Sequence, residues 1–392
     1  MALGFSKTRY SPIAIDFGAD SLKLLQVIPG DPPQMVAAAS ATVPAQARTD
    51  PEARYAFLAQ ALRDLLKSQP FKGRRAICSL PAFQTLVQNL EVTGEAAELD
   101  THVQLQLQQR WNIDPRRMVV RHFHVGQVVR DGTPLQEVIC LAASRDIVMR
   151  YIDLANRCRL DLVGMHSEPW AIVRAFEPIY RDPADAQRTI CFIDLGAATS
   201  KVVITHGSQI VFAKTIHTAG DAAGGSAARA DASDDKPAVV QEPTVITGVA
   251  PRAQGAAQAR SAAAAGAATG LAILDAQVQA DAPADPTPPK PAAEIDEVIE
   301  CLVDELQLCL RYHQSVFPSK PVERLVFLGG GARDVQTCQA IARAARIAAQ
   351  LGDPLARVTR IAMPKPPTGV DLNQPQPGWT VPLGLCLSEA NL

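Results

Sequence analysis

The chain of 392 residues is long enough for two or three domains. Its 38 basic and 40 acidic residues give a formal net charge of −2, which excludes the basic excess expected of a nucleic-acid-binding surface. The sequence contains no uninterrupted run of about 18 apolar residues. We therefore expect no direct membrane insertion, so that any membrane role goes through a partner.

The eight cysteines are scattered, and none forms a Cys-x-x-Cys pair or lies beside a histidine cluster. Most fall inside apolar runs such as 76–78 and 138–141. This pattern is typical of buried, reduced thiols in a cytosolic protein, and it does not favour a zinc site.

The first part of the chain predicts alternating strands and helices. Asp50 is placed to cap a helix that begins at Pro51, and apolar residues then recur at helical spacing. In chain order we expect a strand-turn-strand over 11–28, a helix over 51–67, strands over 76–80 and 84–90, a helix over 95–111, strands over 119–129 and 136–143, and a helix over 146–158. The β-β-α-β-β-α block over 71–158 predicts a small subdomain inserted into a larger domain.

The second part of the chain predicts a similar mixture. We expect strands over 160–165 and 189–193 with a helix over 169–180 between them, a hairpin of 201–204 with 209–216, a helix over 294–314, a strand over 325–328 and a helix over 335–351. Between them, residues 219–293 are dominated by Ala, Gly, Pro, Asp and Gln. Such a segment buries too little apolar surface to offset its ordering entropy, so we predict a disordered insertion with room for a weak strand or helix over 271–278.

One motif occurs twice, 178 residues apart. The segments 16–23 and 194–201 both read Asp, apolar, Gly, Ala, any residue, Ser or Thr, any residue, Lys, and each joins two predicted strands. One such turn alone is an ordinary β-turn. Two matching copies at this separation predict two similar domains.

The chemistry of this motif favours a polyphosphate. Glycine lets a phosphate approach the backbone, successive turn amides form an anion-binding nest, and the hydroxyl adds a donor. An Asp beside a polyphosphate requires a cation between them, and Mg²⁺ held through water is the natural one. The candidate nucleotide-binding residues are Asp16, Gly18, Ala19, Ser21 and Lys23 in the first turn, and Asp194, Gly196, Ala197, Thr199 and Ser200 in the second.

A third element is the strand over 325–328, which runs into Gly329, Gly330 and Gly331 before a helix. Three glycines leave bare backbone against which a flat ring can lie. Alone, this segment is an ordinary strand-to-helix connection. Together with the repeat it predicts a turn that holds a flat ring, and the family resemblance described next implies that this ring belongs to adenosine.

These three elements, in this order, resemble the superfamily of actin, heat-shock chaperones and sugar kinases. Within it the chain resembles the PilM family of type IV pilus assembly proteins, relatives of FtsA, over 1–218 and 294–387. The resemblance implies an α/β, two-domain actin-like (ribonuclease H-like) fold. Its units are a first domain over 1–70 and 159–188, an inserted subdomain over 71–158, a second domain over 189–218 and 294–392, and the low-complexity insertion over 219–293.

The resemblance also implies ligands and partners. It implies binding of ATP with Mg²⁺, the metal being held through water by Asp16 and Asp194, and the ribose being reached by Glu305. Glu168 lies where related ATPases keep a water-orienting residue, although a helix-start carboxylate is the simpler interpretation. The implied partner is the cytoplasmic N-terminal peptide of a PilN-like inner-membrane protein, docked on the first domain and the subdomain. The chain is then expected in the cytoplasm, peripheral to the inner membrane, with other pilus platform and motor proteins and self-association left open.

The sequence departs from the family where residues 218–221 run directly into the low-complexity segment. This predicts a reduced outer half of the second domain, with weakened nucleotide binding and still weaker hydrolysis. Two alternatives therefore stay open. One is a nucleotide-free adaptor of a type II secretion or pilus machine. The other is a carbohydrate kinase of the same superfamily, which would need a catalytic Asp as base.

Overall fold

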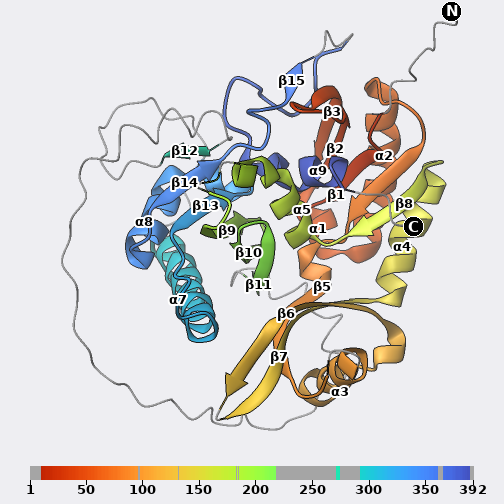
Figure 1. Cartoon of the computed structure of the whole chain (residues 1–392). Coiled ribbons are helices and arrows are strands. Elements are labelled where there is room, and N and C mark those ends of the chain that lie inside the picture. Colours follow the sequence, from red (N-terminus) through yellow and green to blue (C-terminus); the bar gives the residue numbers. More distant parts are fainter. Residues whose placement is uncertain are drawn as a thin grey trace, which may run out of the picture.

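A computed structural model describes residues 10–95, 98–130, 132–181, 183, 185–217, 271–273, 292–360 and 365–388. Two six-stranded sheets lie beside each other, and a smaller three-stranded sheet lies below them in Figure 1. Most of the low-complexity segment predicted over 219–293 lies outside the described residues. Within those residues, no helix is both long enough and apolar enough to cross a membrane.

The first sheet has the strand order β15-β3-β2-β1-β4-β8. Helices α2 and α4 pack on it through a core that includes Leu58, Leu62 and Tyr151. As predicted, Asp50 caps α2 by accepting hydrogen bonds from the amides of Glu52 and Ala53. The elements are β1 (Ile13–Phe17), β2 (Ser21–Ile28), β3 (Gln34–Thr42), α1 (Ala45–Thr49), α2 (Pro51–Ser68), β4 (Arg75–Ser79), α4 (Arg145–Arg157), β8 (Asp161–His166) and β15 (Thr359–Arg360).

Five strands of the second sheet repeat this topology, with the order β11-β10-β9-β13-β14, and β12 adds a sixth strand beside β14. In each sheet three antiparallel strands are followed by two parallel ones, so the repeated motif reflects a repeated fold. Helices α7 and α8 cover the second sheet. The elements are β9 (Thr189–Leu195), β10 (Thr199–His206), β11 (Gln209–His217), β12 (Leu271–Ile273), α7 (Ala292–Val316), β13 (Arg324–Leu328), α8 (Val335–Ala345) and β14 (Ala349–Gly352).

Two short helices, α5 (Glu168–Ala175) and α9 (Thr380–Cys386), contribute to the core cluster that both large sheets share. They touch each other at backbone distance. A Cβ added at Gly384 would lie 1.8 Å from the carbonyl oxygen of Ala171, so only glycine fits there. The two domains therefore meet through a continuous apolar core.

The inserted subdomain is the three-stranded sheet β5-β7-β6 with helix α3 on it. It comprises β5 (Thr85–Val92), α3 (Leu99–Trp111), β6 (Met118–Arg130) and β7 (Thr133–Ser144). Two elements that the sequence placed in the subdomain over 71–158 belong to the first domain instead. Strand β4 pairs with β1, and α4 packs on α2, because their apolar residues complete the first domain's core.

The helix predicted over 335–351 was too long. Helix α8 ends at Ala345, since Arg346 adopts a left-handed conformation with φ of 55°. Residues 349–352 then form β14, parallel to β13. Helical spacing alone could not show this pairing with a strand more than twenty residues earlier.

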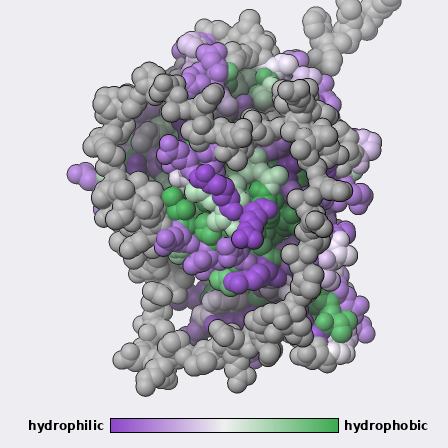
Figure 2. All heavy atoms as spheres, turned by 90° about the vertical axis from the view of Figure 1, so that its left-hand side faces the viewer, coloured by the Kyte–Doolittle hydropathy of each residue, from purple (hydrophilic) through white to green (hydrophobic). Residues whose placement is uncertain are grey.

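Figure 2 shows the face formed by the second domain, where α7 and α8 lie. Apolar surface gathers in the middle of this face and is bordered by hydrophilic side chains. Leu308 on α7 and Val335 on α8 are among the exposed large apolar residues of the molecule. Single exposed residues of this kind are common on soluble proteins.

A buried polar group joins the subdomain to the second domain. Glu137 on β7 is completely buried and accepts hydrogen bonds from Asn89 Nδ2 at 2.7 Å and from the Tyr312 hydroxyl at 2.9 Å. The Asn89 side chain also bonds the backbone of β11 at Val211 and Ala213. The amide thus pairs with the edge of β11 much as another strand would.

This junction predicts a pH dependence of stability. Burial raises the pKa of Glu137 from 4.5 to about 7, although hydrogen bonds from Asn89 and Tyr312 work against the rise. The nearby Glu91 charge raises this pKa and Arg130 lowers it. The folded state therefore binds a proton more tightly, and its stabilising effect is full below pH 4.5 and lost as the pH rises through 7.

We expect Glu137→Gln to flatten this pH dependence, which amounts to a total change of about 3 kcal/mol in the free energy of unfolding. The free energy of unfolding, measured by urea denaturation at pH 5, 6, 7 and 8, checks this. The exposed Glu300→Gln variant on α7 is the control. An unchanged slope in Glu137→Gln would contradict the assignment.

Candidate functional site

The repeated motif forms two hairpin turns, and the spacing that both copies share places Lys opposite Asp. Asp16 pairs with Lys23 across β1 and β2, and Asp194 pairs with Lys201 across β9 and β10. Both carboxylates are buried, with exposed fractions of 6% and 5%. In an antiparallel pair, residues opposite each other point to the same face. The Lys at the end of the motif is thus the counterion of its own Asp.

Lys201 binds two carboxylates from different parts of the fold. Its Nζ lies 3.0 Å from Asp194 Oδ2 and 2.5 Å from Glu168 Oε2. All three side chains are at most 9% exposed. Burial lowers the pKa of Lys201, but the charges of Asp194 and Glu168 outweigh it and hold the pKa above its ordinary value.

Asp16 joins the same cluster from the first domain. Its carboxylate lies 3.6 Å from Lys23 Nζ and accepts a hydrogen bond of 3.4 Å from Ser79 Oγ. Burial raises the pKa of Asp16, whereas the charges of Lys23 and Lys201 lower it and that of Asp194 raises it again. The two turns are therefore close enough for their charges to interact. We call Asp16, Lys23, Glu168, Asp194 and Lys201 the charge cluster.

The turn glycines are required by close backbone contacts. A Cβ on Gly18 would lie 2.9 Å from the carbonyl oxygen of Ser21, and one on Gly196 would lie 2.6 Å from that of Thr199. The Gly196 amide donates to the Thr199 carbonyl at 3.1 Å, so this amide already has a partner within the turn. Ala197 at the tip is exposed.

The hydroxyl residues of the two turns differ in their surroundings. Ser21 Oγ donates to Asp20 Oδ1 at 3.0 Å on a partly buried surface. Thr199 and Ser200 are buried, with exposed fractions of 4% and 2%. The hydroxyl of the first turn is therefore nearer to solvent than the hydroxyls of the second turn. Gly18 and Ala19 lie in the same turn as this hydroxyl.

The glycine turn after β13 reaches the same place. Leu328 pairs with Asp194 in the parallel β13–β9 ladder. Gly329 follows with φ of +82°, and a Cβ there would lie 2.2 Å from Asp194 Oδ1. A Cβ on Gly331 would lie 2.9 Å from that of Leu195, whereas one on Gly330 would meet nothing within 4 Å. The fold brings all three predicted elements together around Asp194.

The two remaining predicted site residues, Glu168 and Glu305, are each bound to other groups of the protein. Glu168 begins α5, where its carboxylate accepts from the Ala82 amide at 2.9 Å as well as from Lys201. This agrees with the simpler expectation of a helix-start carboxylate. Glu305 on α7 forms an ion pair of 2.6 Å with Lys214 on β11, and both side chains are about one-third exposed.

Arg54 supports the first turn and was missed by the sequence analysis. Its guanidinium donates to the carbonyls of Gly18 at 2.5 Å and Ala19 at 2.9 Å, and the residue is 4% exposed. It also lies over the Phe83 ring, 5.0 Å from its centroid. The available signal was its position four residues before Leu58, which puts a charged side chain on the buried stripe of α2.

The residues of the charge cluster fit Mg²⁺ only if waters and phosphate oxygens supply most of its ligands. Among the described residues, no group of three or more His, Cys, Asp or Glu side chains could hold a metal ion. The charge cluster nevertheless contains three carboxylates and two ammonium groups, which favours a cation. Mg²⁺ usually keeps several waters and takes one or two carboxylates plus phosphate oxygens. Asp16 and Asp194 suit a metal site of that kind.

The eight cysteines are free thiols.

The two motif lysines predict unequal effects on stability. We expect Lys201→Met to lower the free energy of unfolding by about 3–5 kcal/mol, because it leaves Glu168 and Asp194 buried without a cation. Lys23 is 19% exposed and lies farther from its partner, so Lys23→Met should cost less. The loss in Lys201→Met should be greater at pH 8 than at pH 5, since the carboxylates can take up protons at low pH.

Urea denaturation of both variants at the two pH values measures this difference. The double variant Lys201→Met/Glu168→Gln should recover part of the loss, since it removes one unpaired charge. Equal losses in the two lysine variants, or a loss independent of pH, would contradict the assigned roles.

Comparisons with known proteins agree with this architecture. The family model described as "Type IV pilus assembly protein PilM" matches residues 14–231, more than half of the chain. A search of curated proteins finds no match. A solved structure of the PilM-PilN type IV pilus biogenesis complex is similar with a TM-score of 0.63 and 18% identity, covering 96% of this chain and 98% of that one.

Two further solved structures are less similar to this chain. The ethanolamine utilization protein EutJ from Carboxydothermus hydrogenoformans has a TM-score of 0.43 and 12% identity, covering 97% of this chain and 90% of that one. The cytoplasmic domain of EpsL from the type II secretion system of Vibrio cholerae has a TM-score of 0.34 and 9% identity, covering 54% of this chain and 72% of that one. The family match and the shared topology together lead to one conclusion: the chain has an actin-like fold and belongs to the PilM family of type IV pilus assembly proteins.

Proposed function

We propose that the chain is a cytoplasmic scaffold of type IV pilus assembly that binds MgATP between its two domains. The observation that carries this proposal is the meeting of both Asp-x-Gly turns and the Gly329 turn around Asp194. A nucleotide needs a place for phosphates, a place for a metal and bare backbone for its base and sugar. The three elements supply groups of these kinds from both domains.

The residues have separable roles in this proposal. The backbone of the turns, with the hydroxyls of Ser21 and Thr199, would hold phosphate oxygens. Asp16 and Asp194 would hold Mg²⁺ through water, and the metal would neutralise the charge between carboxylates and phosphates. A Cβ on Gly330 would point into open space, so this residue would offer backbone to a flat ring. Glu305 would serve the ribose only if it left Lys214.

Hydrolysis is the less supported part of this function. The Glu168 carboxylate is held by the Ala82 amide and by Lys201. It could orient a water molecule only after giving up one of these bonds. We therefore propose nucleotide binding as the main property, and any turnover as slow.

Titration of MgATP into the full chain by calorimetry tests the binding proposal. We expect micromolar affinity, and Asp194→Asn should weaken it at least tenfold, or about 1.4 kcal/mol. Asp16→Asn should act in the same direction, because both turns face the cluster. The exposed Asp64→Asn variant on α2 is the matched control. Absence of heat and of thermal stabilisation up to millimolar MgATP would contradict the proposal.

A nucleotide-free adaptor is the second candidate. Lys201 forms ion pairs with both Asp194 and Glu168, so the protein itself supplies a cation for these carboxylates. In addition, two cavities of about 230 and 200 Å³ in the described part of the chain are lined by residues outside both turns. In that case the titration above would fail while partner binding would persist.

We also propose that a PilN-like inner-membrane protein docks its cytoplasmic N-terminal peptide where the subdomain meets the first domain. Phe123 on β6 stacks on Trp170 of α5 with ring centroids 3.9 Å apart, yet Phe123 is 39% exposed. Strand β6 pairs only with β7 among the described strands, so its outer edge can accept an extended segment. A similar complex, of PilM with PilN, supports this type of partner. This docking would place the chain at the inner membrane.

Fluorescence anisotropy with a labelled synthetic peptide of that N-terminal segment tests the docking site. We expect Phe123→Ala to weaken binding at least tenfold. Val129→Ala, on the same strand and 67% exposed, should leave it unchanged. Equal effects of the two variants, or no effect of Phe123→Ala, would place the peptide elsewhere.

A further inference from the structure

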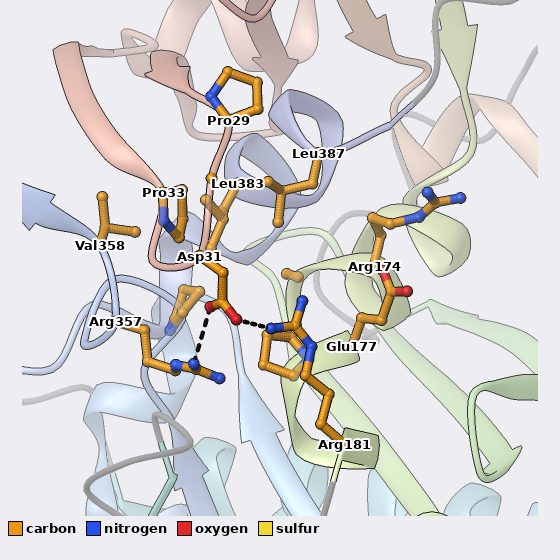
Figure 3. Close-up of a pocket in the computed structure, with 14 residues that line it drawn as sticks. Pro29, Asp31, Pro33, Arg174, Glu177, Arg181, Arg357, Val358, Leu383 and Leu387 are labelled. Atoms are coloured by element: carbon orange, nitrogen blue, oxygen red, sulfur yellow. Dashed lines mark hydrogen bonds and ion pairs between the residues drawn. The ribbon is translucent and has the colours of Figure 1, made fainter.

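A cavity of about 230 Å³ opens at the end of the first sheet that is opposite the phosphate turns. Figure 3 shows the residues that line it, which come from the β2–β3 turn, the end of α5 and the segment after it, the segment after β14, and α9. Strand β2, of eight residues, separates this end from the Asp16 turn by about 25 Å at a rise of about 3.3 Å per residue. The cavity is thus distinct from the charge cluster.

The inner wall of the cavity is apolar. Leu383, Val358 and Ala175 belong to the core cluster shared by the two domains, and Leu387 packs against it. In Figure 3 the side chains of Leu383 on α9 and of Leu387, the residue after this helix, lie on the side of the turn that carries Asp31. An apolar group entering the cavity would therefore extend the core that joins the domains.

The rim carries three arginines and two acids: Arg174, Arg181, Arg357, Asp31 and Glu177. Asp31 is shared between two of the arginines. Its Oδ2 forms an ion pair with Arg181, and its Oδ1 lies 3.2 Å from Arg357 Nη2. One carboxylate thus serves two guanidinium groups, each of which has five N–H donors. The rim keeps a net positive charge and unused capacity for a second carboxylate.

These ion pairs are easily exchanged. The side chains of Asp31 and Arg181 are 53% and 56% exposed, and that of Arg357 is 30% exposed. Exposed ion pairs contribute only about 0–1 kcal/mol, so an incoming acid can replace Asp31 at little cost. Bidentate arginine–carboxylate pairing would make the replacement favourable.

The size of the cavity limits its occupant. Sites for drug-sized ligands and cofactors span about 300–1,000 Å³, so this one suits an amino-acid side chain better than a nucleotide. We propose that the cavity docks a segment of a partner protein that presents a carboxylate beside an aliphatic or aromatic side chain. The apolar side chain fills the wall formed by α9, and the carboxylate takes the place of Asp31 between Arg181 and Arg357. This site requires neither MgATP nor the β6 surface.

Panning a phage-displayed random heptapeptide library on the full chain tests the proposal. We expect the enriched sequences to place Asp or Glu next to Leu, Ile, Met or Phe. Labelled copies of the selected peptides are then titrated by fluorescence anisotropy. The charge reversal Arg181→Glu/Arg357→Glu should weaken binding at least tenfold. The matched reversal Arg110→Glu/Arg157→Glu, on exposed surfaces of α3 and α4, should have no effect.

Asp31→Asn is expected to change the affinity for the peptides in the opposite direction. Because it removes the internal competitor, it should tighten peptide binding, whereas a purely apolar pocket would not respond. The selected peptides should bind the parent chain equally with and without MgATP, so failure of the MgATP site would not affect this result. Enriched sequences without acids, or equal binding to the charge-reversed variant, would overturn the proposal, as would weaker binding by Asp31→Asn. Thermal melting checks that each variant is folded.

Discussion

The buried ammonium group of Lys201 is the contact on which the arrangement of the two domains and the candidate site both depend. It holds Asp194, which lies opposite it in the second domain's hairpin, and Glu168, which begins the helix packed against the first domain. Because burying a charge is costly unless it is paired, none of these three groups can move alone. The ion pairs therefore tie the position of the second turn to that of α5.

Polar contacts of this kind recur at the junctions between the units. The interior of the two-domain body is apolar, with α5 and α9 in contact at Gly384. The cluster around Lys201 and the Glu137 group, by contrast, lie where one unit meets another. Buried polar contacts are directional and leave a large penalty when they are half broken. These contacts therefore specify one relative position of the units. They are also groups with which a ligand or a partner of the scaffold can interact.

Much of this fold could be predicted from the sequence, because its strongest signals are local. The two Asp-x-Gly turns, the glycine turn and the Asp50 cap each depend on residues within one short segment. The repeat then supplied a long-range relation that single elements lack. The resemblance to the PilM family followed from these segments, and the family match over 14–231 confirms it.

What could not be predicted depends on contacts between distant segments. Helical spacing continued past Ala345, but pairing with β13 turned the following residues into β14. Nothing near Glu168 in the sequence indicates that Lys201, 33 residues away, would neutralise it. Likewise, Arg54 is recognisable only as a charge on a buried stripe, and its carbonyl partners become visible in three dimensions. The role of the motif lysines as counterions required the strand register.

The most direct test of the account is a crystal structure of the full chain grown with Mg²⁺ and a non-hydrolysable ATP analogue. We expect density for the triphosphate between the turns at Asp16 and Asp194, with the base beside the Gly329–Gly331 turn. Density at another place in the molecule, or an unliganded cluster with Lys201 still bound to both acids at saturating nucleotide, would contradict it. The chain would then be an actin-like adaptor that functions without nucleotide.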